Sequence, residues 1–207
     1  VLLSHILIKV MLKNNPYIYY ALIFFAPLFV FIFNEYNEIL ANSDGQHYLD
    51  IALMQYQIFE DQGVIAGLES IYNVRSIGLR PLIYPVYITL FMLLTQGDLY
   101  LTTSLVMSSI ALIWVIYLYR IFLWSGCSKI VSAFGSVLLV IWPGFTYYHY
   151  NMFSETAHIT VLFMFIFYIL DSDYFKNRLS VYKAGTCAAI MLCIRPELIF
   201  IVPLGLS

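Results

Sequence analysis

Four ionic residues in this otherwise apolar chain are of types that could act on a polar substrate: Asp44, Arg80, Glu155 and Arg195. A carboxylate can accept a proton from a hydroxyl group, and a guanidinium can bind the oxygens of a phosphate. Ordinary structural roles are the alternatives. An acid in the first turn of a helix is favoured by the helix dipole, and an arginine beside an apolar segment can reach lipid headgroups.

Arg195 stands out because it lies, with Pro196 and Glu197, inside the apolar run 188–206. A charge within a bilayer costs about 3 kcal/mol on insertion scales, and proline removes a backbone donor there. We therefore assign Arg195 and Glu197 to substrate binding. Mutual neutralisation of Arg195 by Glu197 or Glu155 is the alternative.

The stretch 42–52, NSDGQHYLDIA, opens the one long polar segment of the chain. Steps of three and four residues place His47, Tyr48 and Ile51 on the same side of a helix that starts at Asp44. An acid and polar rings facing one way at a membrane surface suit a site for a polar substrate. A solvated loop helix would have the same pattern.

Composition identifies the class of protein. Of 207 residues, 62% are hydrophobic and 11% are charged, and the mean hydropathy is +0.84. Soluble domains carry about a quarter charged residues, so we expect an integral membrane protein built only of helices. The net charge of −2 gives no attraction to nucleic acid. We interpret residues 1–207 as a single transmembrane domain, the N-terminal part of a longer protein.

Five apolar runs are expected to cross the membrane, and Pro16 suits the first turn of the first. They are residues 17–33, 99–124, 130–145, 156–170 and 182–206. Residues 34–98 form the first outer loop, with amphipathic or interfacial helices. One helix is expected to run from about Asp44 to Phe59, before the breaker at 61–63, and residues 67–78 are expected to be irregular.

The short apolar segment 81–94 decides the topology. If it crossed, five basic residues in short loops would lie outside, against the positive-inside tendency. They are Arg120, Lys129, Lys176, Arg178 and Lys183. If it only enters the outer interface, these residues join Lys9 and Lys13 in the cytoplasm. We adopt the second arrangement, which puts the N-terminus in the cytoplasm and Asp44, Glu155 and Arg195 on the outer face.

The order of these pieces resembles the polytopic glycosyltransferases that use lipid-linked sugars, a superfamily that includes the protein O-mannosyltransferases and the aminoarabinose transferase. The matching motifs are SDGQHYLDIA with Asp44, LRPLIYP with Arg80, FSET with Glu155 and IRPE with Arg195. The resemblance covers the chain from Pro16 onward.

The resemblance implies transfer of a sugar from a polyprenyl-phosphate donor to a hydroxyl of a lipid, glycan or protein acceptor. Asp44 would be the general base and Glu155 would position the sugar, the acceptor or Arg80. Both arginines would stabilise charge on the leaving phosphate. Further substrate contacts would come from His47, Tyr48, Tyr84 and Glu197. Some members of the family need a divalent metal and others do not, so none is assigned.

Two other functions stay open. A transporter or flippase fragment would use Arg195 to line a pathway, although the chain has no internal repeat of the kind common in transporters. A polymerase or ligase acting on lipid-linked glycans would share the outer-face site and the lipid phosphate.

The topology predicts the outcome of cysteine labelling at Thr95 or Gln96. A cysteine there should react from the outer side if residues 81–94 are interfacial, because the chain then has not yet crossed back. Labelling from the cytoplasm would contradict a shared outer-face site.

Overall fold

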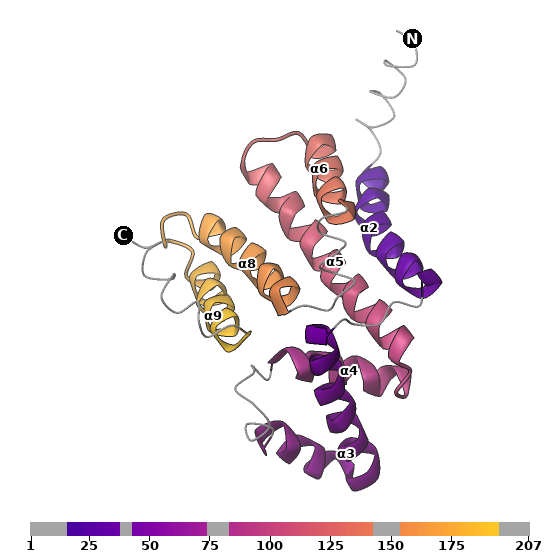
Figure 1. The fold of residues 1–207 in the computed structure, drawn as a ribbon. Coiled ribbons are helices and arrows are strands. Elements are labelled where there is room, and N and C mark those ends of the chain that lie inside the picture. The colour runs from indigo at the N-terminus through magenta and orange to yellow at the C-terminus, as the bar shows by residue number, and fades with distance from the viewer. Residues whose placement is uncertain (1–15, 38–42, 74–82, 143–153, 195–207) are drawn as a thin grey trace.

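The computed structural model describes residues 16–37, 43–73, 83–142 and 154–194. All regular structure in these ranges is helical, which confirms the expected all-helical class for this part of the chain (Figure 1). The helices are α2 (Pro16–Asn37), α3 (Ser43–Asn73), α4 (Ile83–Thr95), α5 (Leu99–Trp124), α6 (Lys129–Ile141), α8 (Ser154–Asp171) and α9 (Arg178–Ile194). As predicted, Pro16 begins the first of them.

Two of the described helices, α5 and α8, are long and apolar enough to cross a membrane. At 26 and 18 residues they extend about 39 and 27 Å, against a bilayer core of about 30 Å. Helix α4 has 13 residues and extends only about 20 Å. Helix α6, which overlaps a predicted span, is equally short at 13 residues. Length therefore does not separate the two, and both the interfacial position of α4 and the five-span count stay predictions.

Helices α5 and α8 run parallel, because residues further along α5 contact residues further along α8. The Trp114 indole N–H donates to the Thr160 hydroxyl, and the Tyr117 and Tyr168 hydroxyls lie 2.8 Å apart. One turn later the Arg120 guanidinium lies 5.2 Å from the centre of the Phe167 ring. The first turns of α5 and α8 therefore point to the same end of the bundle.

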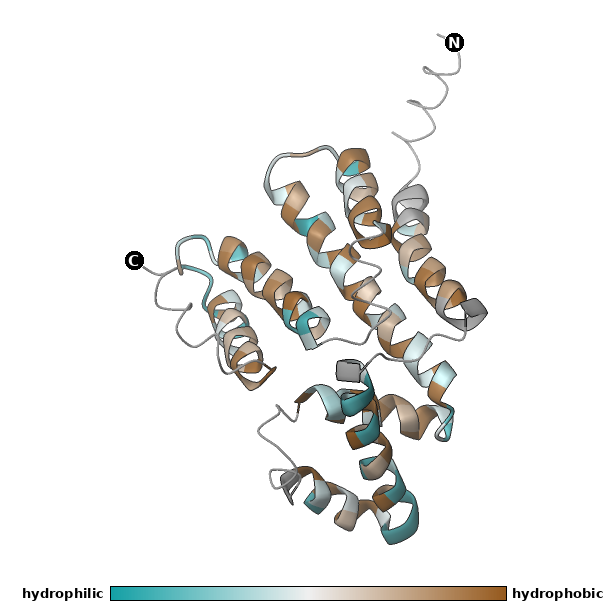
Figure 2. Ribbon diagram, viewed as in Figure 1, coloured by the Kyte–Doolittle hydropathy of each residue, from teal (hydrophilic) through white to brown (hydrophobic). Residues whose placement is uncertain are grey.

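Helices α2 and α6 pack beside α5 and keep apolar outer faces. The Ser108 hydroxyl on α5 donates to the Pro27 carbonyl on α2 at 2.6 Å. On the opposite side of α2, large exposed side chains recur at every fourth residue. They are Tyr20, Phe24, Leu28 and Ile32, and α6 exposes Val131, Phe134 and Leu138. The described parts of both helices are mostly brown in Figure 2, the colour of hydrophobic residues. The exposed surface of this part of the bundle is thus apolar.

A buried polar contact joins α3 to α4. The Thr89 hydroxyl lies 2.8 Å from Gln55 Oε1 and 2.9 Å from the Pro85 carbonyl, and both side chains are buried. Close by, the turn after α4 has Gly97 at φ 82°, where a Cβ would lie 2.8 Å from the Tyr56 ring. Helices α3 and α4 and the turn into α5 therefore form one packed unit.

Helix α3 consists of two helical segments joined at a kink. The kink is at Gly63, where φ is 84° and ψ is 177°, so the breaker predicted at 61–63 is confirmed. The prediction that the chain is irregular from Gly67 is wrong for residues 67–73, which are helical, and residues 74–78 lie outside the described residues. Across the kink, the Phe59 ring lies against the backbone of Gly67, in space that a Cβ there would need.

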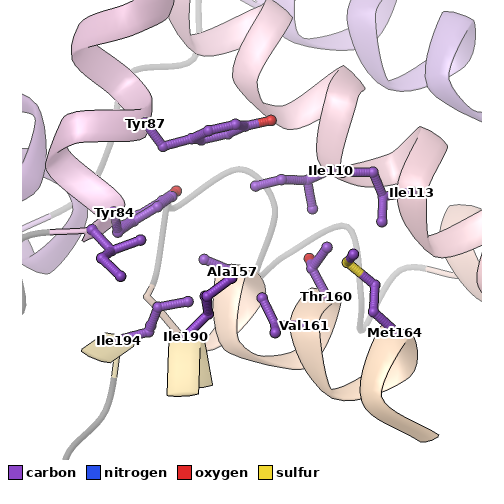
Figure 3. A pocket seen from close by; sticks show the side chains of 11 residues that line it. Tyr84, Tyr87, Ile110, Ile113, Ala157, Thr160, Val161, Met164, Ile190 and Ile194 are labelled. Carbon is purple, nitrogen blue, oxygen red and sulfur yellow. The ribbon is translucent and has the colours of Figure 1, made fainter. Parts of the chain in front are cut away.

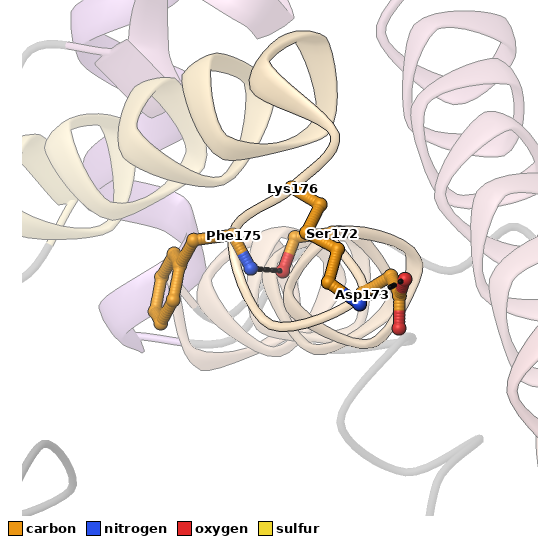
Figure 4. Close-up of polar contacts among 4 residues, drawn as sticks. All are labelled: Ser172, Asp173, Phe175 and Lys176. Carbon is orange, nitrogen blue, oxygen red and sulfur yellow. Dashed lines mark hydrogen bonds and ion pairs between the residues drawn. The ribbon is translucent and has the colours of Figure 1, made fainter.

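A tight turn reverses the chain between α8 and α9 (Figure 4). Asp173, Tyr174 and Phe175 are all left-handed, with φ of 44°, 54° and 66°. The Phe175 N–H donates to the Ser172 hydroxyl at 3.4 Å, and the Lys176 ammonium lies 3.4 Å from the Asp173 carboxylate. Helix α9 consequently packs antiparallel to α8 (Figure 1).

Replacing Thr89 by Val should lower the free energy of unfolding by about 1–3 kcal/mol, because Gln55 Oε1 would lose its described donor while buried. Adding Gln55→Met should reduce that loss, since both partners are then apolar. Denaturation of the detergent-solubilised protein measures both variants. A double variant less stable than Thr89→Val would contradict this assignment.

Candidate functional site

A cavity of about 160 Å³ lies where α4, α5, α8 and α9 meet (Figure 3). Tyr84 and Tyr87 of α4 face α8 across it, and isoleucines of α5 and α9 close two sides. The full lining is Ile83, Tyr84, Tyr87, Ile110, Ile113, Ala157, Thr160, Val161, Met164, Ile190 and Ile194. The site is therefore an apolar space beside the start of α8.

Three residues predicted to bind substrate form a chain of rings leading from this cavity. Tyr84 lines it, and the Tyr48 ring packs edge-on against Tyr84 with centroids 5.4 Å apart. The His47 ring lies 6.4 Å from the Tyr48 ring and is half-buried. Burial raises the pKa of the Tyr84 hydroxyl well above its usual range, so this group stays a neutral hydrogen-bond donor.

The two predicted catalytic acids belong to helix starts at the same end of the bundle (Figure 1). Glu155 lies in the first turn of α8, half-buried, two residues before Ala157 of the cavity lining. The Ser154 hydroxyl lies 3.5 Å from its Oε2. Asp44 lies in the first turn of α3, one turn before Tyr48, and its side chain is outside the described residues.

The remaining predicted site residues lie outside the part of the chain that the structure describes. They are Arg80, Arg195 and Glu197. The last described residue before the second arginine, Ile194, lines the cavity. Their roles as phosphate and substrate ligands stay predictions.

Within the described ranges, no three His, Cys, Asp or Glu side chains are grouped so that they could hold a metal ion. The cysteines in these ranges, Cys127, Cys187 and Cys193, are free thiols. The geometry of the described residues thus offers no ligand set to which a divalent metal could be assigned.

Most of the cavity lining could not be selected from the sequence. Ala157, Val161, Ile190 and Ile194 are residue types that any apolar helix contains. The one usable signal was Thr160, a polar residue among apolar neighbours, and it pairs with the buried Trp114. Apolar walls become recognisable only when the helices are placed together.

Comparison with protein-family models, with characterised proteins and with solved structures gives no match. The resemblance to the lipid-linked-sugar glycosyltransferases therefore depends on the four sequence motifs. What the structure adds is the placement of α3, α4 and α8 relative to one another.

Replacing Tyr48 by Ala should lower the free energy of unfolding by about 3–5 kcal/mol, because a buried ring packed on Tyr84 is removed. Tyr20→Ala is the matched control: that ring is 59% exposed, and the expected change is within about 0.5 kcal/mol. Chemical denaturation in detergent compares the two. Equal losses would mean that the Tyr48–Tyr84 contact does not hold α3 on α4.

Proposed function

We propose that this chain is a membrane glycosyltransferase that moves a sugar from a polyprenyl-phosphate donor to an acceptor hydroxyl on the outer face. The observation that supports the proposal is that the starts of α4 and α8 and the end of α9 meet at one apolar cavity, with the start of α3 packed on α4 through the Tyr48 and Tyr84 rings. These are the segments that hold or adjoin all four sequence motifs. A lipid-linked substrate needs such a combination of polar helix ends and an apolar space.

Membrane insertion is supported by the outer faces of the bundle. The exposed stripe of α2, from Tyr20 to Ile32, and that of α6 would leave large apolar surfaces in water. Contiguous apolar surface on this scale is typical of contact with lipid or another protein. Helices that are apolar on every side are expected in a membrane.

Sidedness is supported by the distribution of basic residues. Every Lys and Arg among the described residues lies near the end of the bundle where α5 and α8 finish and α6 and α9 begin. They are Arg120, Lys129, Lys176, Arg178 and Lys183. By the positive-inside tendency this end faces the cytoplasm, so the opposite end, with Asp44 and Glu155, faces outward.

In the proposed reaction, Asp44 takes the proton of the acceptor hydroxyl as its oxygen attacks the sugar. The bond between the sugar and the lipid phosphate breaks, and the phosphate leaves with the bonding electrons. Arg80 and Arg195 stabilise the negative charge on that phosphate. Glu155 positions the sugar, the acceptor or Arg80 from the first turn of α8.

The test is transfer of radiolabelled sugar from a polyprenyl-phosphate donor by the purified protein in lipid nanodiscs. Asp44→Asn should lower the rate about 100-fold or more, because the base is removed without changing the shape of the side chain. Asp50→Asn is the matched control on the same helix. Asp50 is exposed and accepts a hydrogen bond from Gln46 at 2.8 Å, so the rate should not change.

Two outcomes would contradict the proposal. An unchanged rate in Asp44→Asn would remove this residue as the base. Movement of the intact lipid donor across reconstituted vesicles, with no release of sugar, would favour the flippase instead.

A further inference from the structure

The cavity between α4 and α8 contains one buried hydroxyl group without a partner. Tyr84 is 1% exposed, and its side chain lies at the edge of the cavity (Figure 3). Its hydroxyl forms no hydrogen bond with any described residue. A buried hydroxyl left without a partner is costly, so natural structures usually pair such groups with protein, water or ligand.

The other polar groups of the lining are already paired. The Tyr87 hydroxyl lies 2.7 Å from the Ser109 hydroxyl. The Thr160 hydroxyl donates to the Thr156 carbonyl at 2.7 Å and accepts from Trp114. The Tyr84 hydroxyl is therefore the one unpaired hydrogen-bonding group among the described lining residues.

The lining also restricts what can occupy the cavity. Its described residues include no charged side chain, so a phosphate or carboxylate placed among them would lose its hydration without gaining a counter-charge from them. A purely hydrocarbon chain would leave the Tyr84 oxygen unpaired. The cavity volume is similar to that of protein cavities that bind benzene. The cavity therefore has room for about six carbon atoms of a chain.

We propose that this cavity binds the chain of a neutral lipid at the point where the chain carries one uncharged oxygen, an alcohol or an ester carbonyl. The Tyr84 hydroxyl forms the hydrogen bond to that oxygen, and Ala157, Val161 and Ile190 enclose the carbons on either side. This binding goes beyond the proposed sugar transfer, because it requires neither Asp44 nor any catalytic step.

The test is photolabelling of the protein in nanodiscs with two probes, dodecanol and dodecane. Each probe carries a diazirine at the same position of its carbon chain. The alcohol should label peptides of α4 and α8 and bind about tenfold more tightly than the hydrocarbon. In Tyr84→Phe this preference should vanish, while Tyr87→Phe should keep it, because the Tyr87 hydroxyl already pairs with Ser109. Equal labelling by both probes in the wild type, or a preserved preference in Tyr84→Phe, overturns the proposal.

A second variant makes the test independent of Tyr84. Ala157→Leu fills the cavity from α8 and should abolish labelling of α4 by both probes; continued labelling there overturns the proposal. An unlabelled long-chain methyl ester, which has no hydroxyl group, and an unlabelled long-chain alcohol compete in parallel. Displacement by one identifies the ester or the alcohol as the natural group, and displacement by neither overturns the site. Asp44→Asn should leave all labelling unchanged, so loss of transfer and loss of binding are separate results.

Discussion

The parallel contact between α5 and α8 determines which helix ends meet. Trp114 is almost completely buried, and its indole N–H has its partner on α8 in Thr160, while its ring packs edge-on against Phe163 at 5.4 Å. Two parallel helices cannot be joined by a short loop, so the chain must return before α8 begins, and α6 starts that return. The starts of α5 and α8 then lie at the end where α3 and α4 pack. Without this contact, Ala157 and Tyr84 would have no reason to line one cavity.

Many buried Ser and Thr hydroxyls bond to carbonyls of their own helix, but other polar side chains join different helices. Ser108 connects α5 to α2, Thr89 connects α4 to α3, and Tyr117 connects α5 to α8. In an apolar surrounding, a hydrogen bond between helices fixes their relative position, because the alternative is a buried group without a partner. Tyr84 differs from these residues in that its hydroxyl joins no two helices among the described residues.

Helix positions could be predicted from the sequence where a long apolar run or a strong start signal was present. Pro16, the run 99–124 and the start of α8 at Ser154 are examples. The breaker at Gly63 could be predicted, but the second helical segment that follows it to Asn73 could not, because that segment packs through the contact of Phe59 with Gly67 across the kink. For the site, the sequence selected Tyr48 and Tyr84 as polar aromatic residues, but it contained no signal that their rings touch. Contacts between distant segments depend on the directions of the helices in space. The spacing of apolar residues along the sequence does not determine those directions.

The kink in α3 has a mechanical consequence for the second half of this helix. The links from α3 to α4 and to the turn after α4 that were identified above, at Tyr48, Gln55 and Tyr56, precede Gly63. Beyond the kink, the Phe59 ring rests on the Gly67 backbone, a contact without directional bonds. Rotation about Gly63 would therefore move residues 64–73 without displacing α4, whose Tyr84 and Tyr87 line the cavity.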